Sequence, residues 1–420
     1  MLFSKLEKII SLNASKFLVA NVLYSISTAL ITFLSPSFLP NEVYEDFIYL
    51  FQMTLFLIGM FTIGLVPGLL RFYKLDKTRY TFYYYLTILI IVLILLILSC
   101  FPQNFLSNSL KISTDSLSNS LVQYCSVIFS LFFIFNRGVE TAKSNYNTIF
   151  IASLIILIVR LIMLFCIKLC NIDNPYYILF LLCILPFTYE MISFIRGVVK
   201  QKICALNGYA EFLGFIFKVS IVGIIFSSTS RLYIIDSKTS DPSLAAALSF
   251  AAGLTGIISI LNTTLSSYFI GTLDHRNSDN IYDYINIVKR YFLPFLLITF
   301  LLGIVVFFFV SYIYTEITIQ AAILSSITVI HCAFIFYIGL ITLLTKTYNK
   351  LNVQILINII TFVMVWFYVR FISKDLSPYL NYILINGIIL LMELILAYII
   401  LRQVKSLNIN KLRFDNLQNV

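Results

Sequence analysis

The sequence predicts an all-α integral membrane protein with about twelve transmembrane helices. Hydrophobic residues make up 60% of its 420 positions and charged residues only 11%, and the mean hydropathy is +0.96. A helix needs roughly 20 apolar residues to cross the ~30 Å hydrocarbon layer, whereas barrel strands are ~10 residues of alternating polarity. Apolar runs of helical length recur along nearly the whole chain. They favour helices and exclude a barrel.

The predicted spans follow one another in order and leave no room for a soluble domain. They cover residues 17–39, 44–70, 80–101, 118–136, 147–168, 176–195, 209–227, 244–271, 291–315, 319–345, 352–371 and 379–401. Eleven spans are the alternative count, because only Tyr314 to Ile317 separates two runs that we interpret as a tight helical hairpin. The longest segments outside the spans are 102–117, 228–243 and 272–290, which are too short for a catalytic or nucleotide-binding domain.

Basic residues are distributed unevenly between the two sides of this topology. Most of the 29 lysines and arginines fall in segments that are cytoplasmic if the N-terminus is cytoplasmic. Cytoplasmic loops of membrane proteins carry such an excess of positive charge. We therefore predict that both termini are cytoplasmic. The net charge of +10 then reflects membrane topology and does not indicate a nucleic-acid partner.

The sequence predicts neither a metal centre nor a disulfide framework. Its seven cysteines stand singly, and its two histidines, His275 and His331, are far apart. For His331, which lies in a predicted span, a hydrogen bond between helices is the simpler interpretation. No glycine-rich phosphate loop followed by Lys-Ser or Lys-Thr occurs. We therefore expect no metal, no bound cofactor and no ATP hydrolysis, so any energy comes from an ion gradient, from substrate supply or from a partner.

Two halves of the chain each contain six predicted spans. We predict two domains, residues 1–200 and 201–420, joined by the basic segment 196–208, with a short basic cytoplasmic tail at the end. A Pro-Ser pair precedes the second span of each half, at residues 36–37 and 242–243, which suggests an internal repeat. Because six is an even number, such a repeat is parallel, with its axis along the membrane normal.

Four ionisable residues lie well inside predicted spans, where a charge facing lipid costs ~2.5 kcal/mol or more. They are Arg160, Glu190, Lys218 and Glu393. At 1.5 Å per residue the last three lie roughly 9–14 Å from the cytoplasmic surface, so they can share one layer. Lys218 then either lines a water-filled cavity or forms an ion pair with Glu190 or Glu393. Each glutamate either forms such a pair or takes part in ion coupling. Arg160 lies nearer the outer side and either reaches inward or extends outward.

The most concentrated group of polar residues within a span lies in the eighth one. It consists of Asn262, Thr263 and Thr264. Such residues more often form hydrogen bonds between helices than contacts with a substrate. We keep them as candidate lining of a cavity beside that simpler interpretation.

The stretch of residues 34–73 resembles the start of polysaccharide exporters of the Wzx O-antigen flippase type. In that family a proline-containing turn and an acidic-aromatic helix start lead to a glycine-rich helix end and an arginine-aromatic pair. The matching residues here are Pro40, Glu42, Tyr44, Glu45, Phe47, Gly64, Gly68, Arg71 and Phe72. The match covers about one tenth of the chain, and Asp46 stands where relatives usually carry a glycine.

This resemblance implies a member of the multidrug, oligosaccharidyl-lipid and polysaccharide exporter superfamily, with two six-helix lobes around a central cationic cavity. The implied cargo is an undecaprenyl-pyrophosphate-linked oligosaccharide, moved between leaflets of the bacterial inner membrane by alternating access. We expect Lys218, Arg160 and Arg71 to bind the pyrophosphate, and Glu190 and Glu393 to act in coupling to H⁺ or Na⁺ or in charge pairs. Membrane lipids and other polysaccharide-assembly membrane proteins are the expected partners.

Three other functions compete with this interpretation. An O-antigen polymerase is also apolar and many-spanned, but such enzymes resemble glycosyltransferases with a large outer loop bearing arginines, and the outer loops predicted here carry few cations. A multidrug cation exporter of the same superfamily favours an acidic cavity, and two interior cations beside two acids leave that alternative open. A lipid II flippase resembles the same fold but usually adds two helices, for which this chain has no room.

Overall fold

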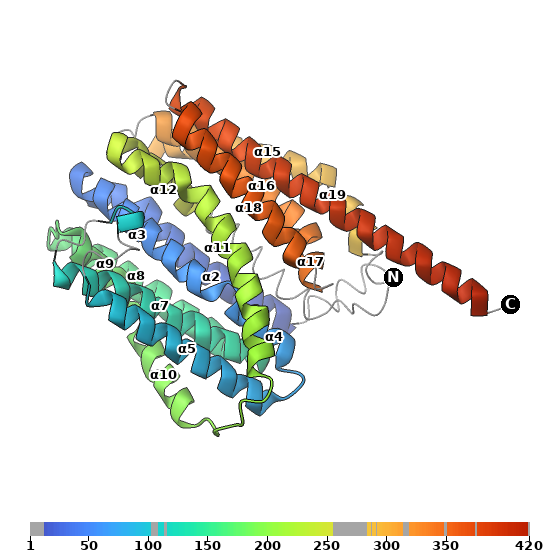
Figure 1. The fold of residues 1–420 in the computed structure, drawn as a ribbon. Coiled ribbons are helices and arrows are strands. Elements are labelled where there is room, and N and C mark those ends of the chain that lie inside the picture. Colours follow the sequence, from blue (N-terminus) through green and yellow to red (C-terminus); the bar gives the residue numbers. More distant parts are fainter. Residues whose placement is uncertain are drawn as a thin grey trace.

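The computed structural model describes residues 12–101, 108–112, 116–254, 284–286, 288–290, 292–313, 319–347, 351–373 and 376–418. Within these residues every regular element is a helix (Figure 1). Eleven of the helices described are long and apolar enough to cross a membrane. The protein is therefore an all-α, multi-pass membrane protein, as the sequence predicts.

The first half of the chain forms six of these spans. Its helices are α2 (Leu12–Phe38), α3 (Asn41–Thr62), α4 (Leu65–Phe72), α5 (Lys77–Ser99), α7 (Leu117–Ala142), α8 (Tyr146–Leu169), α9 (Pro175–Cys183), the 3₁₀ turn η1 (Leu185–Phe187) and α10 (Thr188–Val199). Several begin with a side-chain cap, as where Asp76 accepts a hydrogen bond from the amide of Arg79 at the start of α5. Together, α3 and α4 make one span, as do α9, η1 and α10.

The second half packs beside the first. Its helices are α11 (Tyr209–Ser240), α12 (Pro242–Leu254), α15 (Phe292–Ile313), α16 (Ile319–Thr342), α17 (Leu344–Thr347), α18 (Leu351–Phe367), the π-helical turn η2 (Tyr368–Ile372) and α19 (Pro378–Gln418). The halves meet where α11 and α12 pack against α2, α3 and α4 (Figure 1). We call this meeting line the junction. The bundle end that carries the 200–208 connection is called the linker end, and the opposite end the distal end.

The predicted outer loop 228–243 is wrong, because α11 continues as a helix to Ser240 and α12 begins at Pro242. Serines and threonines lower the hydropathy of this stretch, yet their hydroxyls bond to the helix itself. Thr229 Oγ1 donates to the carbonyl of Ile225 at 2.7 Å, and Ser237 Oγ donates to that of Tyr233 at 2.7 Å. These hydroxyl groups therefore have hydrogen-bond partners inside a span.

Two further boundaries differ from the prediction. The last helix, α19, runs to Gln418, so the segment predicted as a tail is helical. The sixth span is interrupted after Cys183 by the turn η1, which contains Pro186. Proline has no amide hydrogen and clashes with the preceding helical turn, so it breaks a helix at this place.

Candidate functional site: a basic pocket in the first half

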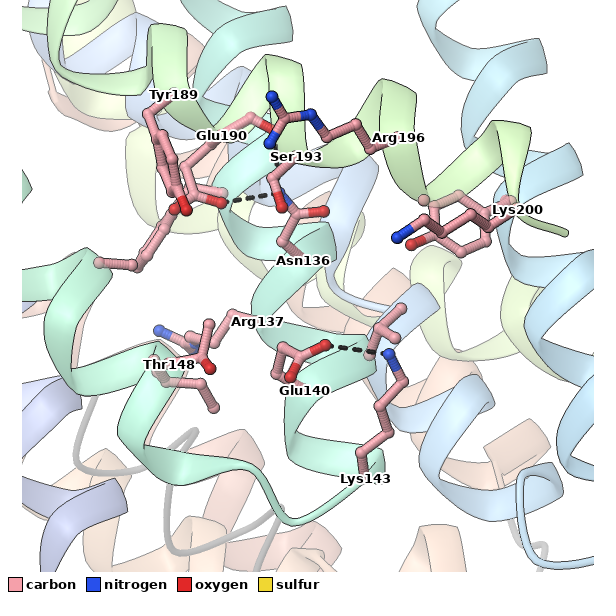
Figure 2. A pocket seen from close by; sticks show the side chains of 16 residues that line it. Asn136, Arg137, Glu140, Lys143, Thr148, Tyr189, Glu190, Ser193, Arg196 and Lys200 are labelled. Carbon is pink, nitrogen blue, oxygen red and sulfur yellow. Dashed lines mark hydrogen bonds and ion pairs between the residues drawn. The ribbon is translucent and has the colours of Figure 1, made fainter.

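A cavity of about 290 Å³ lies between helices of the first half, near the linker end (Figure 2). Four helices line it, and α7 and α10 supply most of the polar side chains. The lining residues are Tyr85, Phe133, Asn136, Arg137, Val139, Glu140, Lys143, Thr148, Ile149, Ala152, Tyr189, Glu190, Ser193, Arg196, Gly197 and Lys200. We call this cavity the basic pocket.

Helical spacing explains why these side chains converge. On α10, Tyr189, Ser193, Arg196 and Lys200 are three or four residues apart, which places them on one face of the helix. The same spacing recurs on α7. Gly197 lets α10 approach α5 closely, because a Cβ atom there would stand 2.4 Å from the hydroxyl of Tyr85.

Both carboxylates of the basic pocket have partners. Glu190 is 5% exposed, and its Oε2 accepts a hydrogen bond from Asn136 Nδ2 at 2.7 Å. Glu140 forms an ion pair with Lys143 at 3.0 Å and accepts from Asn145 Nδ2 at 2.6 Å. Figure 2 shows these two groups on opposite sides of the opening. Glu140 is therefore paired with a cation of the wall, whereas the described partner of Glu190 is a neutral amide.

Three cations of the basic pocket have no such compensation. Arg137, Arg196 and Lys200 form no ion pair with any residue that the structure describes. Arg137 lies five residues before the end of α7, which places it about 8 Å along the helix from that end. A basic site at this depth is suited to an anion, because charge interactions strengthen as the surroundings become less polar.

Arg160 lies elsewhere in the first half, beside the break in the sixth span. In an unbroken helix the carbonyl of Leu182 accepts from the amide of residue 186, but Pro186 has no amide hydrogen. Arg160 Nε donates to that carbonyl instead, at 3.1 Å. Its Nη1 donates to Ser27 Oγ at 2.9 Å and to Thr28 Oγ1 at 3.0 Å. The guanidinium therefore connects α2, α8 and the broken span.

Two aromatic rings enclose the same guanidinium, which is 2% exposed. The ring centroid of Phe187 lies 5.1 Å from its central carbon and that of Tyr24 lies 5.7 Å away. Such contacts stabilise a desolvated cation. Arg160 is thus held inside the first half by contacts that its side chain makes there, and its predicted role in binding cargo stays a prediction.

The other predicted cations lie on α4 and α11. Lys218 is exposed on α11 and forms no ion pair with a described residue. Arg71 lies in the last turn of α4, and its guanidinium lies 4.5 Å from the ring centroid of Phe215 on α11. Arg71 therefore joins the two halves at the linker end. The structure does not place either residue in the basic pocket.

Neither predicted glutamate forms an ion pair with a predicted cation in the described part of the chain. Glu393 is 7% exposed on α19 and makes no hydrogen bond or ion pair with the described part of the chain. Glu190 pairs with Asn136 and not with Lys218. Asn262, Thr263 and Thr264 lie outside the described residues. No group of three metal-binding side chains occurs among those described.

Sequence reasoning missed the cations of the basic pocket because they lie at the margins of spans. The sequence places Arg137, Arg196 and Lys200 just after the predicted spans 118–136 and 176–195, among the basic residues that orient the chain. Their spacing of three or four residues from other polar side chains on α7 and α10 was the feature of the sequence that could have indicated a shared face. In the structure, α7 extends to Ala142 and α10 to Val199, so these positions are helical or adjoin a helix.

Comparisons with known proteins identify the fold. No family model matches the sequence, and no curated protein matches it significantly. Among solved structures, a MATE protein in complex with MaD3S is similar with a TM-score of 0.67 and 11% identity, over 94% of this chain and 96% of that one. A eukaryotic MATE transporter has a TM-score of 0.60 and 12% identity, with 96% and 98% covered.

A transporter of the MOP superfamily from Pyrococcus furiosus is also similar, with a TM-score of 0.64 and 10% identity over 94% of this chain and 96% of that one. Its description states that a binding pocket of reverse polarity suggests a different function. The chain therefore has the fold of MATE transporters of the MOP superfamily, which have twelve transmembrane helices in two lobes. Its structural neighbours are transporters.

Proposed function

We propose that this protein is a flippase for an undecaprenyl-pyrophosphate-linked oligosaccharide, an O-antigen or related repeat unit. It moves this cargo from the cytoplasmic to the outer leaflet of a bacterial inner membrane, with both chain termini in the cytoplasm. The observation that carries the proposal is the set of three cations in the basic pocket, Arg137, Arg196 and Lys200, that form no ion pair with a described residue. The fold supports transport as the class of activity.

The chemistry of the cargo fits this arrangement. A pyrophosphate presents several negatively charged oxygens, and arginine binds such groups through paired hydrogen bonds. The linker end is the cytoplasmic end in the predicted topology, so the basic pocket faces the leaflet where the cargo is made. Exposed apolar side chains cover the surfaces of α8 and α15, where a lipid tail can remain in contact with the bilayer.

Close packing at the junction is compatible with alternating access. A Cβ atom at Gly64 of α3–α4 would stand 2.3 Å from the carbonyl oxygen of Ile216 on α11. A Cβ atom at Gly223 would stand 2.3 Å from the side chain of Ile63. These glycines allow the halves to touch near the linker end, and rocking of one half against the other separates them.

Coupling to H⁺ or Na⁺ is assigned to the buried glutamates in this proposal. Glu190 is the stronger candidate, because its carboxylate lies in the basic pocket and accepts from Asn136 at 2.7 Å. A carboxylate that gains a proton there loses its charge beside the pyrophosphate site. Other polysaccharide-assembly membrane proteins are the expected partners, since they supply and use the same cargo.

A second candidate is export of organic cations. One structural neighbour is described as a multidrug resistance MATE family transporter. The observation that favours this function is Glu393, a buried carboxylate on α19 with no partner among the described residues. A cationic drug would compensate that charge. The basic pocket favours an anion and makes this the weaker candidate.

Translocation in proteoliposomes tests the choice between them. We expect the native protein to move a fluorescent undecaprenyl-pyrophosphate oligosaccharide between leaflets and the Arg137→Gln variant to do so at least about tenfold more slowly. Arg402→Gln is the matched control, because Arg402 is an exposed arginine outside the basic pocket. A native protein that expels small organic cations and moves no lipid-linked glycan contradicts the proposal.

A further inference from the structure

Two lysines cross the junction at the distal end, one from each half of the chain. Lys238 of α11 reaches the first half, where its Nζ lies 2.7 Å from Asp46 Oδ1 on α3. Lys111, between α5 and α7, reaches the second half, where its Nζ donates to the carbonyl of Asp236 at 3.2 Å and to Thr239 Oγ1 at 3.0 Å. The two contacts therefore join the halves in opposite directions.

Helical spacing on α3 accounts for the contacts of Lys238. Asp46 and Tyr49 are three residues apart, so they lie on one face of the helix. The carboxylate binds the ammonium group, and the ring centroid of Tyr49 lies 5.0 Å from Nζ. The Lys238 side chain is 18% exposed and that of Asp46 is 66% exposed. The ion pair is therefore open to water on its acidic side.

The segment 108–112, which carries Lys111, is fixed to the first half. Tyr49 Oη donates to the carbonyl of Leu110 at 2.6 Å, and the side chains of Leu110 and Ile112 are buried. Lys111 has a φ of 51°, a left-handed conformation that residues other than glycine rarely adopt. Such a conformation persists where its surroundings hold it. The anchored segment therefore presents the Lys111 side chain to α11.

The end of α11 suits the ammonium group of Lys111. This helix ends at Ser240, so Asp236 and Thr239 belong to its last turns. The carboxyl end of a helix carries a partial negative charge, which attracts a cation. Ion pairs and polar contacts that water can reach are individually weak. The contacts of both lysines can therefore hold the distal end closed and still break during transport.

The packing behind these lysines leaves polar atoms without partners. A Cβ atom at Gly253 of α12 would stand 2.5 Å from Thr32 Oγ1 of α2 and 2.8 Å from Gln52 Nε2 of α3, so three helices meet closely here. Neither polar atom has a hydrogen-bond partner in the part of the chain that the structure describes. Water that enters between separated helices supplies such bonds. This contact therefore gains hydrogen bonds when it opens, and the contacts of the two lysines oppose the opening.

We propose that Lys111 and Lys238 hold the distal end closed and that their contacts across the junction break in each transport cycle. We call these two lysines, with Asp46, Asp236 and Thr239, the distal latch. The inference rests on the rocking of the two halves in the proposed function and does not depend on the cargo. The structure describes the state in which the distal latch is closed.

The reactivity of introduced cysteines tests the distal latch without any cargo. Thr32→Cys reports the distal part of the junction, and Ser220→Cys reports the part nearer the linker end, where a Cβ atom at Gly64 would stand 2.3 Å from Ser220 Oγ. Peptide mass spectrometry measures the reaction with a polar maleimide at each position, so the seven native cysteines can stay. We expect Lys111→Met combined with Lys238→Met to raise the reaction rate of Thr32→Cys at least about threefold and to leave that of Ser220→Cys within about 1.5-fold.

Lys168→Met is the matched control for the loss of a cation at the same end of the bundle. Lys168 lies in the last turn of α8, and its Nζ lies 4.6 Å from the ring centroid of Phe38 on α2. Its contact therefore stays within the first half, so we expect Thr32→Cys to react at the native rate. An equal rise in this control, a rise at both reporters, or an unchanged Thr32→Cys in the double lysine variant overturns the proposal.

A covalent bond across the distal latch gives the reverse test. A water-soluble carbodiimide joins an ammonium group to a neighbouring carboxylate as an amide, and the reagent takes up the water that is lost. We expect mass spectrometry to find Lys238 joined to Asp46, and the reaction of Thr32→Cys to become at least about threefold slower. Asp46→Asn cannot form this bond, so the same treatment should leave its reaction rate unchanged. A joined protein that reacts as fast as the untreated one also overturns the proposal.

These experiments separate the distal latch from the proposed cargo. Faster reaction of Thr32→Cys in the double lysine variant, in a protein that moves no lipid-linked glycan, supports the distal latch and removes the proposed cargo. Translocation of the glycan by the native protein, with unchanged reaction of Thr32→Cys in the double lysine variant, supports the flippase and removes the distal latch.

Discussion

Two groups of cations in the first half of the chain differ in what surrounds them. Arg160 donates hydrogen bonds to Leu182, Ser27 and Thr28 and lies between two aromatic rings. Arg137 and Arg196 line an open cavity and have no ion-pair partner in the described chain. Depth in the membrane therefore does not identify a ligand-binding cation. The number of contacts that the protein itself supplies is more informative.

Replacement of Arg160 tests one side of this comparison and has the largest expected effect. Arg160→Met leaves the Leu182 carbonyl without a donor and removes the hydrogen bonds from α8 to Ser27 and Thr28 of α2, so we expect a loss of about 3 kcal/mol in the free energy of unfolding. Thermal denaturation in detergent measures this loss. Arg160→Lys restores little, because one ammonium group cannot reproduce the planar set of donors.

The opposite result would support the role in cargo binding that the resemblance predicts. If Arg160→Met unfolds at the native temperature and yet translocates no cargo, Arg160 acts on the cargo and the comparison is wrong. Arg402→Gln controls for a general effect of removing an arginine, because its side chain is exposed.

Close packing at the junction gives the next largest effect. In Gly64→Ala the new methyl group meets the backbone carbonyl of Ile216, so α4 and α11 move apart. Overpacking of this kind costs about 1–3 kcal/mol. We expect a lower unfolding temperature, with transport altered because the contact at the linker end is lost.

Two other glycines provide controls for the Gly64 experiment. A Cβ atom at Gly59 or Gly214 meets nothing within 4 Å. Alanine is favoured over glycine inside a helix by about 0.5–1 kcal/mol, so Gly59→Ala and Gly214→Ala are expected to be neutral or stabilising. Equal destabilisation in all three variants argues against a specific contact between α4 and α11.

The unpaired cations of the basic pocket are expected to change transport and to leave stability unaltered. Arg137→Met removes a charge that forms no ion pair with a described residue, so we expect the unfolding temperature to stay the same. A tenfold slower translocation corresponds to about 1.4 kcal/mol in the transition state. The unfolding temperature and the translocation rate should both be measured for Arg137→Met and Arg160→Met. Equal losses of stability in the two variants would show that the two arginines do not differ in their structural role.

Hydropathy and residue patterns predicted the helical class and the approximate positions of the spans. They failed where a polar residue is satisfied by its own helix, as at Thr229 and Ser237 in α11. They also left open which groups surround Arg160. Pro186 is visible in the sequence, but the donor that replaces its amide comes from residue 160, and only the packing of two helices brings them together.

The pocket cations were missed for a related reason. A window average assigns Arg137 and Arg196 to the ends of spans, where charge is ordinary and carries no specific meaning. Only the side-by-side packing of α7, α8 and α10 encloses these ends around a cavity. A single sequence does not determine the contacts between helices that are distant along the chain.

The ion pair that joins the halves at the distal end has the smallest expected effect. Lys238 Nζ lies 2.7 Å from Asp46 Oδ1, with side chains 18% and 66% exposed. An ion pair with one exposed partner contributes about 0.2–1 kcal/mol, so Lys238→Met should lower the unfolding temperature only slightly. It also loosens a contact that closes the distal end, so translocation is expected to rise by less than twofold and to depend less on salt.

Arg79→Gln removes a pair within the first half, at 3.4 Å, and controls for charge loss alone. If both variants change translocation equally, the Lys238–Asp46 pair is a surface contact and the distal end is closed by the packing of α12 against α2 and α3.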